Sequence, residues 1–183
     1  MKRRWTGGLL GASLTWFALQ PSTLAMPDPA HLIVPGKAIG PVALGAHVSD
    51  LKARIGPPDD VRAIDSDHAL LQWREYSLVV GVEQERVVLV GTNSNQYQTS
   101  TGLKVGVPGV RALAMFPGLT PPKVRGLFGL VDDVMGINFL HHPADAHGVP
   151  LKSFQLPEDW VIDEINVYQS SNDLVIDRKD APL

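Results

Sequence analysis

The sequence predicts an α+β protein made of two related units, each a short helical segment packed on a small antiparallel sheet. Three observations favour this fold class. A Gly-ended helical segment at 46–55 has a fainter counterpart at 108–116, and the turns before the two segments lie about 61 residues apart. Each segment is followed by short runs of apolar or alternating residues, which are typical of strands. Similarity repeated at a fixed spacing indicates two copies of one structural unit.

The N-terminal residues have the pattern of a secretory signal peptide. Lys2, Arg3 and Arg4 precede a short apolar segment, and small residues lie just before Met26. The apolar segment is short for a membrane span. We therefore expect cleavage after Ala25 and a periplasmic or secreted protein. The alternative is an uncleaved membrane anchor.

The chain divides into five expected segments. They are the signal peptide at 1–25, an extended N-terminal arm at 26–37, a first helix-plus-sheet unit at 38–98, a second unit at 99–169 with a long loop at 141–159, and a polar tail at 170–183.

Charge and cysteine content exclude several classes of function. Loss of residues 1–25 removes three basic residues and no acidic one, so the net charge falls from −3 to −6. Nucleic-acid binding needs a basic surface, so we expect no nucleic-acid partner. The chain has no cysteine, which excludes disulfides, thiol catalysis and a lipid-modified cysteine. Phosphate-binding and dinucleotide-binding motifs do not occur in the sequence, so we expect no cofactor.

The first unit begins with the helical segment at 46–55. His47 or Ser49 is expected to cap its N-terminus, and Gly56 to end it before two prolines. Its apolar face is formed by residues at helical spacing, namely Val48, Leu51 and Ile55. Strands are expected at 69–73, 78–82 and 86–90, the last apolar enough to be covered on both faces.

The second unit repeats this order less clearly. Its helix is expected at 108–116 with Leu113 in the buried face, and its strands at 127–130, 136–140 and 160–168. The last two strands are separated by the 141–159 loop, whereas three residues join the corresponding strands of the first unit. Loops this long are uncommon in compact domains and are often functional or disordered.

The order of these motifs resembles a known repeat. Leu44-Gly45, the helix ending at Ile55-Gly56-Pro57-Pro58, and Trp73 followed by a hairpin are similar to the repeat of the β-lactamase inhibitor protein and of the small outer-membrane assembly lipoproteins (BamE/SmpA). A second turn and helix run from Val105-Gly106 to Phe116, so the resemblance covers about residues 38–169. It implies a helix-capped antiparallel sheet that binds another protein. The chain lacks the lipobox cysteine of the lipoproteins and the disulfides of the inhibitors.

One group of residues has the chemistry of a metal site. His142, Asp145 and His147 could reach one ion, since imidazole and carboxylate ligands suit zinc and other divalent metals. The alternative is a polar loop with incidental histidines, because adjacent His141 and His142 would point to opposite faces of a strand. Neighbouring carboxylates, such as Asp163 and Glu164, are interpreted as solvated charge at strand ends rather than as a catalytic pair.

These observations favour an exported, non-enzymatic protein-binding module, acting as an envelope-assembly accessory or as an enzyme inhibitor. The partner is expected to be another protein, with no transmembrane segment and no lipid anchor in the mature chain. The candidate partner-binding residues are Glu83, Gln84, Glu85, Phe154 and Tyr168. The alternative function is a metal-dependent or carbohydrate-active hydrolase centred on the 141–159 loop.

Overall fold

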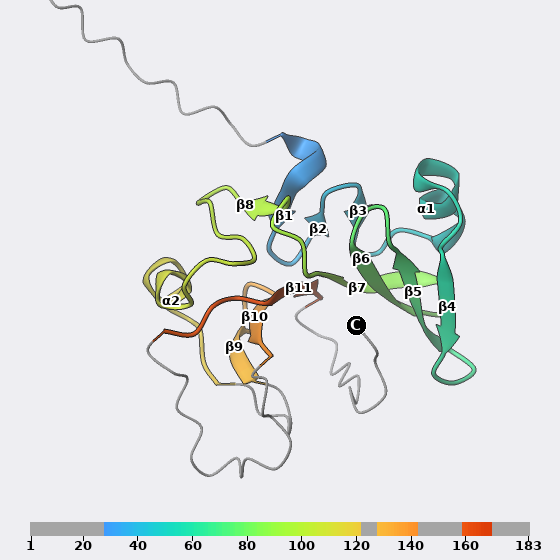
Figure 1. The fold of residues 1–183 in the computed structure, drawn as a ribbon. Coiled ribbons are helices and arrows are strands. Elements are labelled where there is room, and N and C mark those ends of the chain that lie inside the picture. The colour runs from blue at the N-terminus through green and yellow to red at the C-terminus, as the bar shows by residue number, and fades with distance from the viewer. Residues whose placement is uncertain (1–27, 122–127, 143–158, 170–183) are drawn as a thin grey trace, which may run out of the picture.

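Two β-sheets account for most of the regular secondary structure in this computed structural model, which describes residues 28–121, 128–142 and 159–169 (Figure 1). The larger sheet has seven strands in the order β4-β5-β6-β7-β11-β10-β9. Its strands are β4 (Asp60–Ala63), β5 (His68–Trp73), β6 (Leu78–Glu83), β7 (Arg86–Thr92), β9 (Phe128–Asp132), β10 (Ile137–His141) and β11 (Glu164–Tyr168).

The smaller sheet has four strands in the order β3-β2-β1-β8. These strands are β1 (Leu32–Val34), β2 (Ala38–Ile39), β3 (Val42–Ala43) and β8 (Gln98–Thr99). The helices of the described ranges are α1 (Val48–Ile55) and α2 (Val110–Met115), and a 3-10 turn, η1 (Pro29–His31), precedes β1. Within the described ranges, no helix has the length and apolar character needed to cross a membrane.

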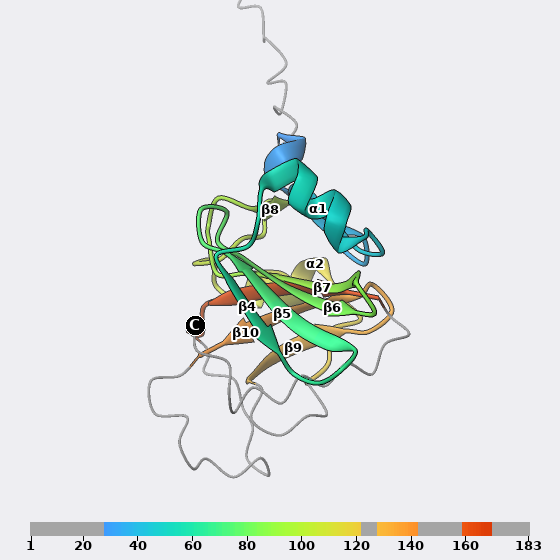
Figure 2. The same cartoon turned by 90° about the vertical axis from the view of Figure 1, so that its right-hand side faces the viewer.

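Helix α1 forms where its sequence signals predict. His47 is the N-cap, and its Nδ1 accepts the backbone N–H of Ser49 at 3.3 Å. Asp50 lies in the first turn, where its charge complements the helix dipole. Gly56 ends the helix at φ 83°, a conformation that glycine adopts without strain. The eight-residue helix lies on one face of the larger sheet (Figure 2).

The antiparallel strands that follow α1 place alternate side chains on the two faces of the larger sheet. Pairs in register, such as Leu71 with Val80 and Val80 with Val90, point to the same face and are buried. This covered face packs against α1 and the smaller sheet, which supplies fully buried Ile33 and Ile39. The hydrophobic core therefore lies between the two sheets.

The strand β11 corrects the predicted fold class. It pairs antiparallel with β7, with Val167 opposite Val90, and with β10 on its other side. The strands that follow α1 and those that follow α2 are thus parts of one continuous sheet. The prediction of an α+β protein made of two helix-on-sheet units is wrong; the protein is mostly β.

Helix α2 contradicts the two-unit prediction independently. Leu51 of α1 is 2% exposed, as expected, but Leu113 of α2 is 46% exposed. Only Ala112 of this six-residue helix is buried. The resemblance to the β-lactamase inhibitor protein and the BamE/SmpA lipoproteins is therefore also wrong, because no tandem of similar helix-and-sheet units is present in the described residues.

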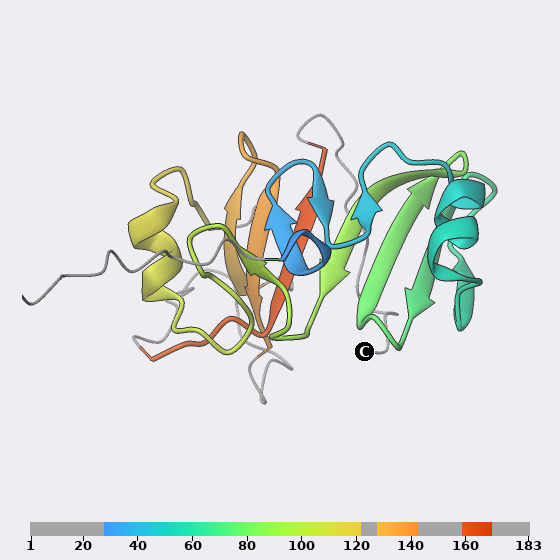
Figure 3. The same ribbon diagram turned by 90° about the horizontal axis from the view of Figure 1, so that it is seen from above.

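The segment expected to be an extended arm contributes to the smaller sheet. Its strand β1 pairs antiparallel with β2 and parallel with β8, with Ile33 opposite Thr99. Viewed from above, the strands of the smaller sheet lie between α1 at one end of the molecule and α2 at the other (Figure 3). Together these elements cover one face of the larger sheet. The hairpin turns lie at the ends of its strands, outside this covered face.

Candidate functional site

Two hairpin turns lie side by side at one end of the larger sheet. The turn between β4 and β5 spans residues 64–67, and the turn between β6 and β7 is the pair Gln84-Glu85. They are neighbours because β5 and β6 are paired with His68 opposite Glu83. The backbone N–H of Gln84 donates to the carbonyl of Asp67 at 2.8 Å and joins the turns. We call the following residues the tip cluster: Asp65, Asp67, His68, Glu83, Gln84 and Glu85.

The turn between β6 and β7 has an unusual backbone. Gln84 and Glu85 have φ values of 48° and 61°. A two-residue hairpin turn of type I′ requires positive φ at both central residues and therefore favours Asn-Gly or Asp-Gly. Each non-glycine residue in this conformation costs about 1–2 kcal/mol. Such strain is found disproportionately at functional positions.

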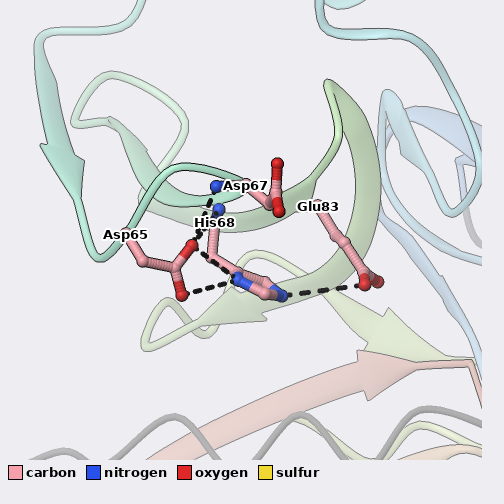
Figure 4. A network of polar contacts seen from close by, with 4 residues as sticks. All are labelled: Asp65, Asp67, His68 and Glu83. Atoms are coloured by element: carbon pink, nitrogen blue, oxygen red, sulfur yellow. Dashed lines mark hydrogen bonds and ion pairs between the residues drawn. The ribbon is translucent and has the colours of Figure 1, made fainter.

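His68 is held between carboxylates within the tip cluster (Figure 4). Its Nδ1 lies 2.8 Å from both carboxylate oxygens of Asp65, and its Nε2 lies 3.7 Å from Oε1 of Glu83. The hydrogen bond to Asp65 raises the pKa of His68 above its usual 6.5. Backbone N–H donation from Asp67, followed by the bond to His68, lowers the pKa of Asp65 below its usual 3.8.

A second histidine joins the Gln84-Glu85 turn to α1. His47 Nε2 lies 3.3 Å from Oε2 of Glu85, and the backbone N–H of Val48 donates to the Glu85 carbonyl at 2.9 Å. Because His47 Nδ1 accepts the N–H of Ser49, Nε2 carries the proton that faces Glu85. The helix N-terminus therefore supports the turn on one side, while Asp67 supports it on the other.

A hollow of about 290 Å³ adjoins the β6–β7 turn. It is lined by residues from the turn, the start of β7, the loop before α1 and the end of β11: Gly45, Glu83, Gln84, Arg86, Val87, Val88 and Gln169. Arg86 Nη1 donates to the Gly45 carbonyl at 3.1 Å, so its guanidinium braces the loop before α1. The acidic side chains of the tip cluster thus lie next to this hollow.

The structure places most of the predicted partner-binding residues at this end of the sheet. Glu83, Gln84 and Glu85 form the β6–β7 tip, whereas Tyr168 lies opposite Leu89, at the middle of β7. Tyr168 is partly buried and donates its hydroxyl to Asp133 Oδ1 at 3.0 Å. Burial, and then the hydrogen bond to Asp133, raise the pKa of Tyr168 well above its usual value. Phe154 lies outside the described residues.

The predicted metal site is described only at His142. Asp145 and His147 lie outside the described ranges. Nε2 of His142 lies 3.0 Å from Oε2 of Glu164, while Nδ1 of the preceding His141 lies 2.8 Å from Oδ2 of Asp163. Among the described side chains, no group of three or more His, Cys, Asp or Glu residues could hold a metal ion.

Two polar features of the structure were not expected from the sequence. The first is the pairing of Asp65 with His68, for which the short spacing between a carboxylate and an imidazole in a turn was an available signal. The second is Glu164, which we interpreted as solvated charge but which is only 4% exposed. Its burial could not be inferred from the neighbouring Asp163, since adjacent strand residues point to opposite faces.

Comparisons with known proteins give no family assignment. No family model matches the sequence, and no curated protein matches it. Solved structures with partial likeness include the uncharacterized protein YfeY from Escherichia coli, at 9% identity and a TM-score of 0.49 over 74% of this chain and 99% of that one.

Two further solved structures resemble the fold at a similar level. One is an extracellular protein containing a SCP domain from Bacillus anthracis, at 10% identity and a TM-score of 0.46 over 83% of this chain and 50% of that one. The other is a cysteine-rich secretory protein from Staphylococcus aureus, at 14% identity and a TM-score of 0.45 over 78% of this chain and 48% of that one. This chain therefore spans about half the length of those two proteins. With TM-scores below 0.5, these likenesses assign neither a family nor a function.

Proposed function

We propose that the protein is an exported protein-binding module that contacts a basic surface of another protein through the tip cluster. The observation that carries this proposal is the strained Gln84-Glu85 turn, which holds Glu83 and Glu85 beside the acidic β4–β5 turn. A stable hairpin does not need this pair of residues, since Asn-Gly would form the same turn with less strain. The retained strain supports a role in binding rather than in folding.

The charges of the tip cluster indicate the chemistry of the partner. Asp65, Asp67 and Glu85 are exposed, and Glu83 is partly exposed. Clustered carboxylates attract a complementary basic surface and increase the rate of association. The hollow beside Gln84 offers space for one side chain of the partner.

Charge reversal at the tip tests the proposal. Glu83→Lys/Glu85→Lys protein should capture its partner from an envelope extract about tenfold less than the unchanged protein at low salt, because complementary charge becomes repulsive. Glu75→Lys is the control for the single variant Glu85→Lys, since each changes the net charge by two and Glu75 is an exposed acid in the turn at the opposite end of β5 and β6. Captured proteins are identified by mass spectrometry, and the folded state of each variant is checked by circular dichroism.

The control separates a specific contact from general charge attraction. Equal loss of capture by Glu85→Lys and Glu75→Lys would show that net charge, and not the tip cluster, drives binding. Full capture by the folded Glu83→Lys/Glu85→Lys protein would refute the tip as the contact surface. Raising the salt concentration should weaken capture by the unchanged protein, because exposed charge pairs are screened within about 10 Å at 0.1 M salt.

A further inference from the structure

The two ring nitrogens of His68 have different contacts within the tip cluster. Figure 4 shows Asp65 on one side of the imidazole and Glu83 on the other. Nδ1 lies 2.8 Å from both carboxylate oxygens of Asp65, whereas Nε2 lies 3.7 Å from Oε1 of Glu83, beyond hydrogen-bond distance. An ionised carboxylate only accepts hydrogen bonds, so Nδ1 carries a proton whenever Asp65 is ionised.

The contact between His68 and Glu83 therefore depends on the second proton of the imidazole. In the neutral ring with its proton on Nδ1, Nε2 is an acceptor and faces a carboxylate that is also only an acceptor. In the imidazolium, Nε2 becomes a charged donor that attracts the same carboxylate. The Glu83 side chain is partly exposed, so its rotation can close the gap of 3.7 Å to hydrogen-bond distance. Protonation of His68 thus draws Glu83 to the ring.

The carboxylates around His68 favour its protonated form. The hydrogen bond to Asp65 is the largest cause of the raised pKa of His68, desolvation opposes it, and the charges of Asp65, Glu83 and Asp67 add to it. Arg86 lies opposite Glu83 in the β6–β7 hairpin, but its Nη1 donates to a backbone carbonyl in the loop before α1. His68 is therefore a group of the tip cluster whose charge changes near neutral pH.

The other histidine beside the β6–β7 turn has a different contact. His47 Nε2 lies 3.3 Å from Oε2 of Glu85. Because its Nδ1 accepts the backbone N–H of Ser49, the neutral ring of His47 already directs its proton to Glu85. Protonation of His47 therefore creates no new donor to Glu85, whereas protonation of His68 creates one to Glu83.

We propose that His68 makes binding at the tip cluster depend on pH: neutral His68 leaves Glu83 to contact a basic partner, and protonated His68 binds Glu83 itself. This inference rests on the proposed function, in which the tip cluster contacts a basic surface. With neutral His68 the four carboxylates of the tip cluster give a charge of −4, and with protonated His68 the charge is −3. Attraction of a basic partner is therefore stronger above the pKa of His68 than below it.

Binding of a rhodamine-labelled oligoarginine peptide, followed by fluorescence anisotropy at constant low salt, tests the inference. The peptide and the carboxylates keep their charge from about pH 5.5 to about pH 8.5. Over this range the Kd should fall about threefold as the pH rises through the pKa of His68, the effect of one exposed ion pair. His68→Asn retains an N–H for Asp65 but does not titrate, so its Kd should be almost constant. His47→Asn, in which asparagine still caps α1, is the matched control and should keep the threefold change.

The inference and the proposed function fail in different ways. If Glu83→Lys/Glu85→Lys protein binds the peptide as well as the unchanged protein does, the tip cluster is not the contact surface and both are overturned. If that variant loses binding but the unchanged protein shows no pH dependence, or His68→Asn keeps it, the inference alone is overturned.

A measurement on the free protein tests the contact with Glu83 separately from binding. The pKa of His68, followed by NMR, should fall in Glu83→Gln protein, because the imidazolium loses the carboxylate that faces Nε2. An unchanged pKa would show that protonated His68 does not bind Glu83 and would overturn the inference. Circular dichroism confirms that each variant is folded.

Discussion

Replacing the strained turn with the sequence that its backbone prefers should separate stability from binding. In Gln84→Asn/Glu85→Gly protein, both central residues of the turn tolerate positive φ. Glycine at position 85 is expected to remove the cost of about 1–2 kcal/mol at that position, and asparagine at position 84 leaves most of the cost there in place. Loss of the exposed contact between Glu85 and His47 offsets about 0–1 kcal/mol of this gain. The net gain in the free energy of unfolding is therefore about 1 kcal/mol.

Urea unfolding and thermal unfolding both measure this gain. A gain of about 1 kcal/mol raises the melting temperature of a chain of this length by about 2–4 °C. Partner capture by the same variant should fall, because one carboxylate of the tip is lost. Ser77→Gly is the matched control. Ser77 also has positive φ, at 51°, but lies in the β5–β6 turn at the opposite end of the strands.

The control should gain a similar stability and keep full partner capture. A double variant of Gln84 and Glu85 that is no more stable than the unchanged protein would refute the argument that the turn is strained. A more stable variant that binds as well as the unchanged protein would remove the reason for proposing that the strain serves binding.

Three further predictions concern the core, the tip cluster and export. Leu51→Ala should lower the free energy of unfolding by about 2–5 kcal/mol and Leu113→Ala by about 0.5 kcal/mol or less, and equal losses in urea unfolding would contradict the burial of only the first. The pKa of His68, followed by NMR, should lie above 6.5 and fall in Asp65→Asn protein, whereas an unchanged pKa would exclude the hydrogen bond as its cause. The stability that this pair contributes should be fully present between pH 3.8 and 6.5 and be lost as the pH rises through the raised pKa of His68 or falls through the lowered pKa of Asp65. Mass spectrometry of exported protein should give a chain that begins at Met26, and a membrane-bound product that retains residues 1–25 would contradict cleavage.

The sequence predicted those elements whose signals are local. Helix α1 was expected at 46–55 and is found at Val48–Ile55, because a capping residue, an apolar face and Gly56 all agree. The hairpin of β6 and β7 was also expected, since apolar runs flank a short polar turn. The smaller sheet was not expected. Its strands β2 and β3 have two residues each, too few for any periodicity to appear.

The exposure of α2 and the composition of the tip cluster depend on tertiary contacts, which local sequence patterns do not determine. Val110 and Leu113 have the three-residue spacing of a buried helix face, yet both are exposed, because α2 is short and buries only Ala112. The spacing describes one side of a helix but not which neighbour covers that side. In the same way, the sequence placed an acidic turn at Glu83–Glu85 but could not bring Asp65 and His68 beside it. That contact depends on the pairing of β5 with β6.

The position of β11 has a consequence for the timing of folding. This strand is the last described element of the chain, yet it lies between β7 and β10 in the larger sheet. Its pairing with β7 joins residues 89–92 to residues 165–168. Contacts between residues so far apart in the sequence slow folding. Among the described strands, the hairpin of β9 and β10 pairs with the rest of the sheet through β11, so this sheet cannot be completed until residue 168 has left the ribosome. At about 5–20 residues per second, synthesis of the segment between β7 and β11 takes several seconds, during which the chain still lacks the strand that joins β7 to β10.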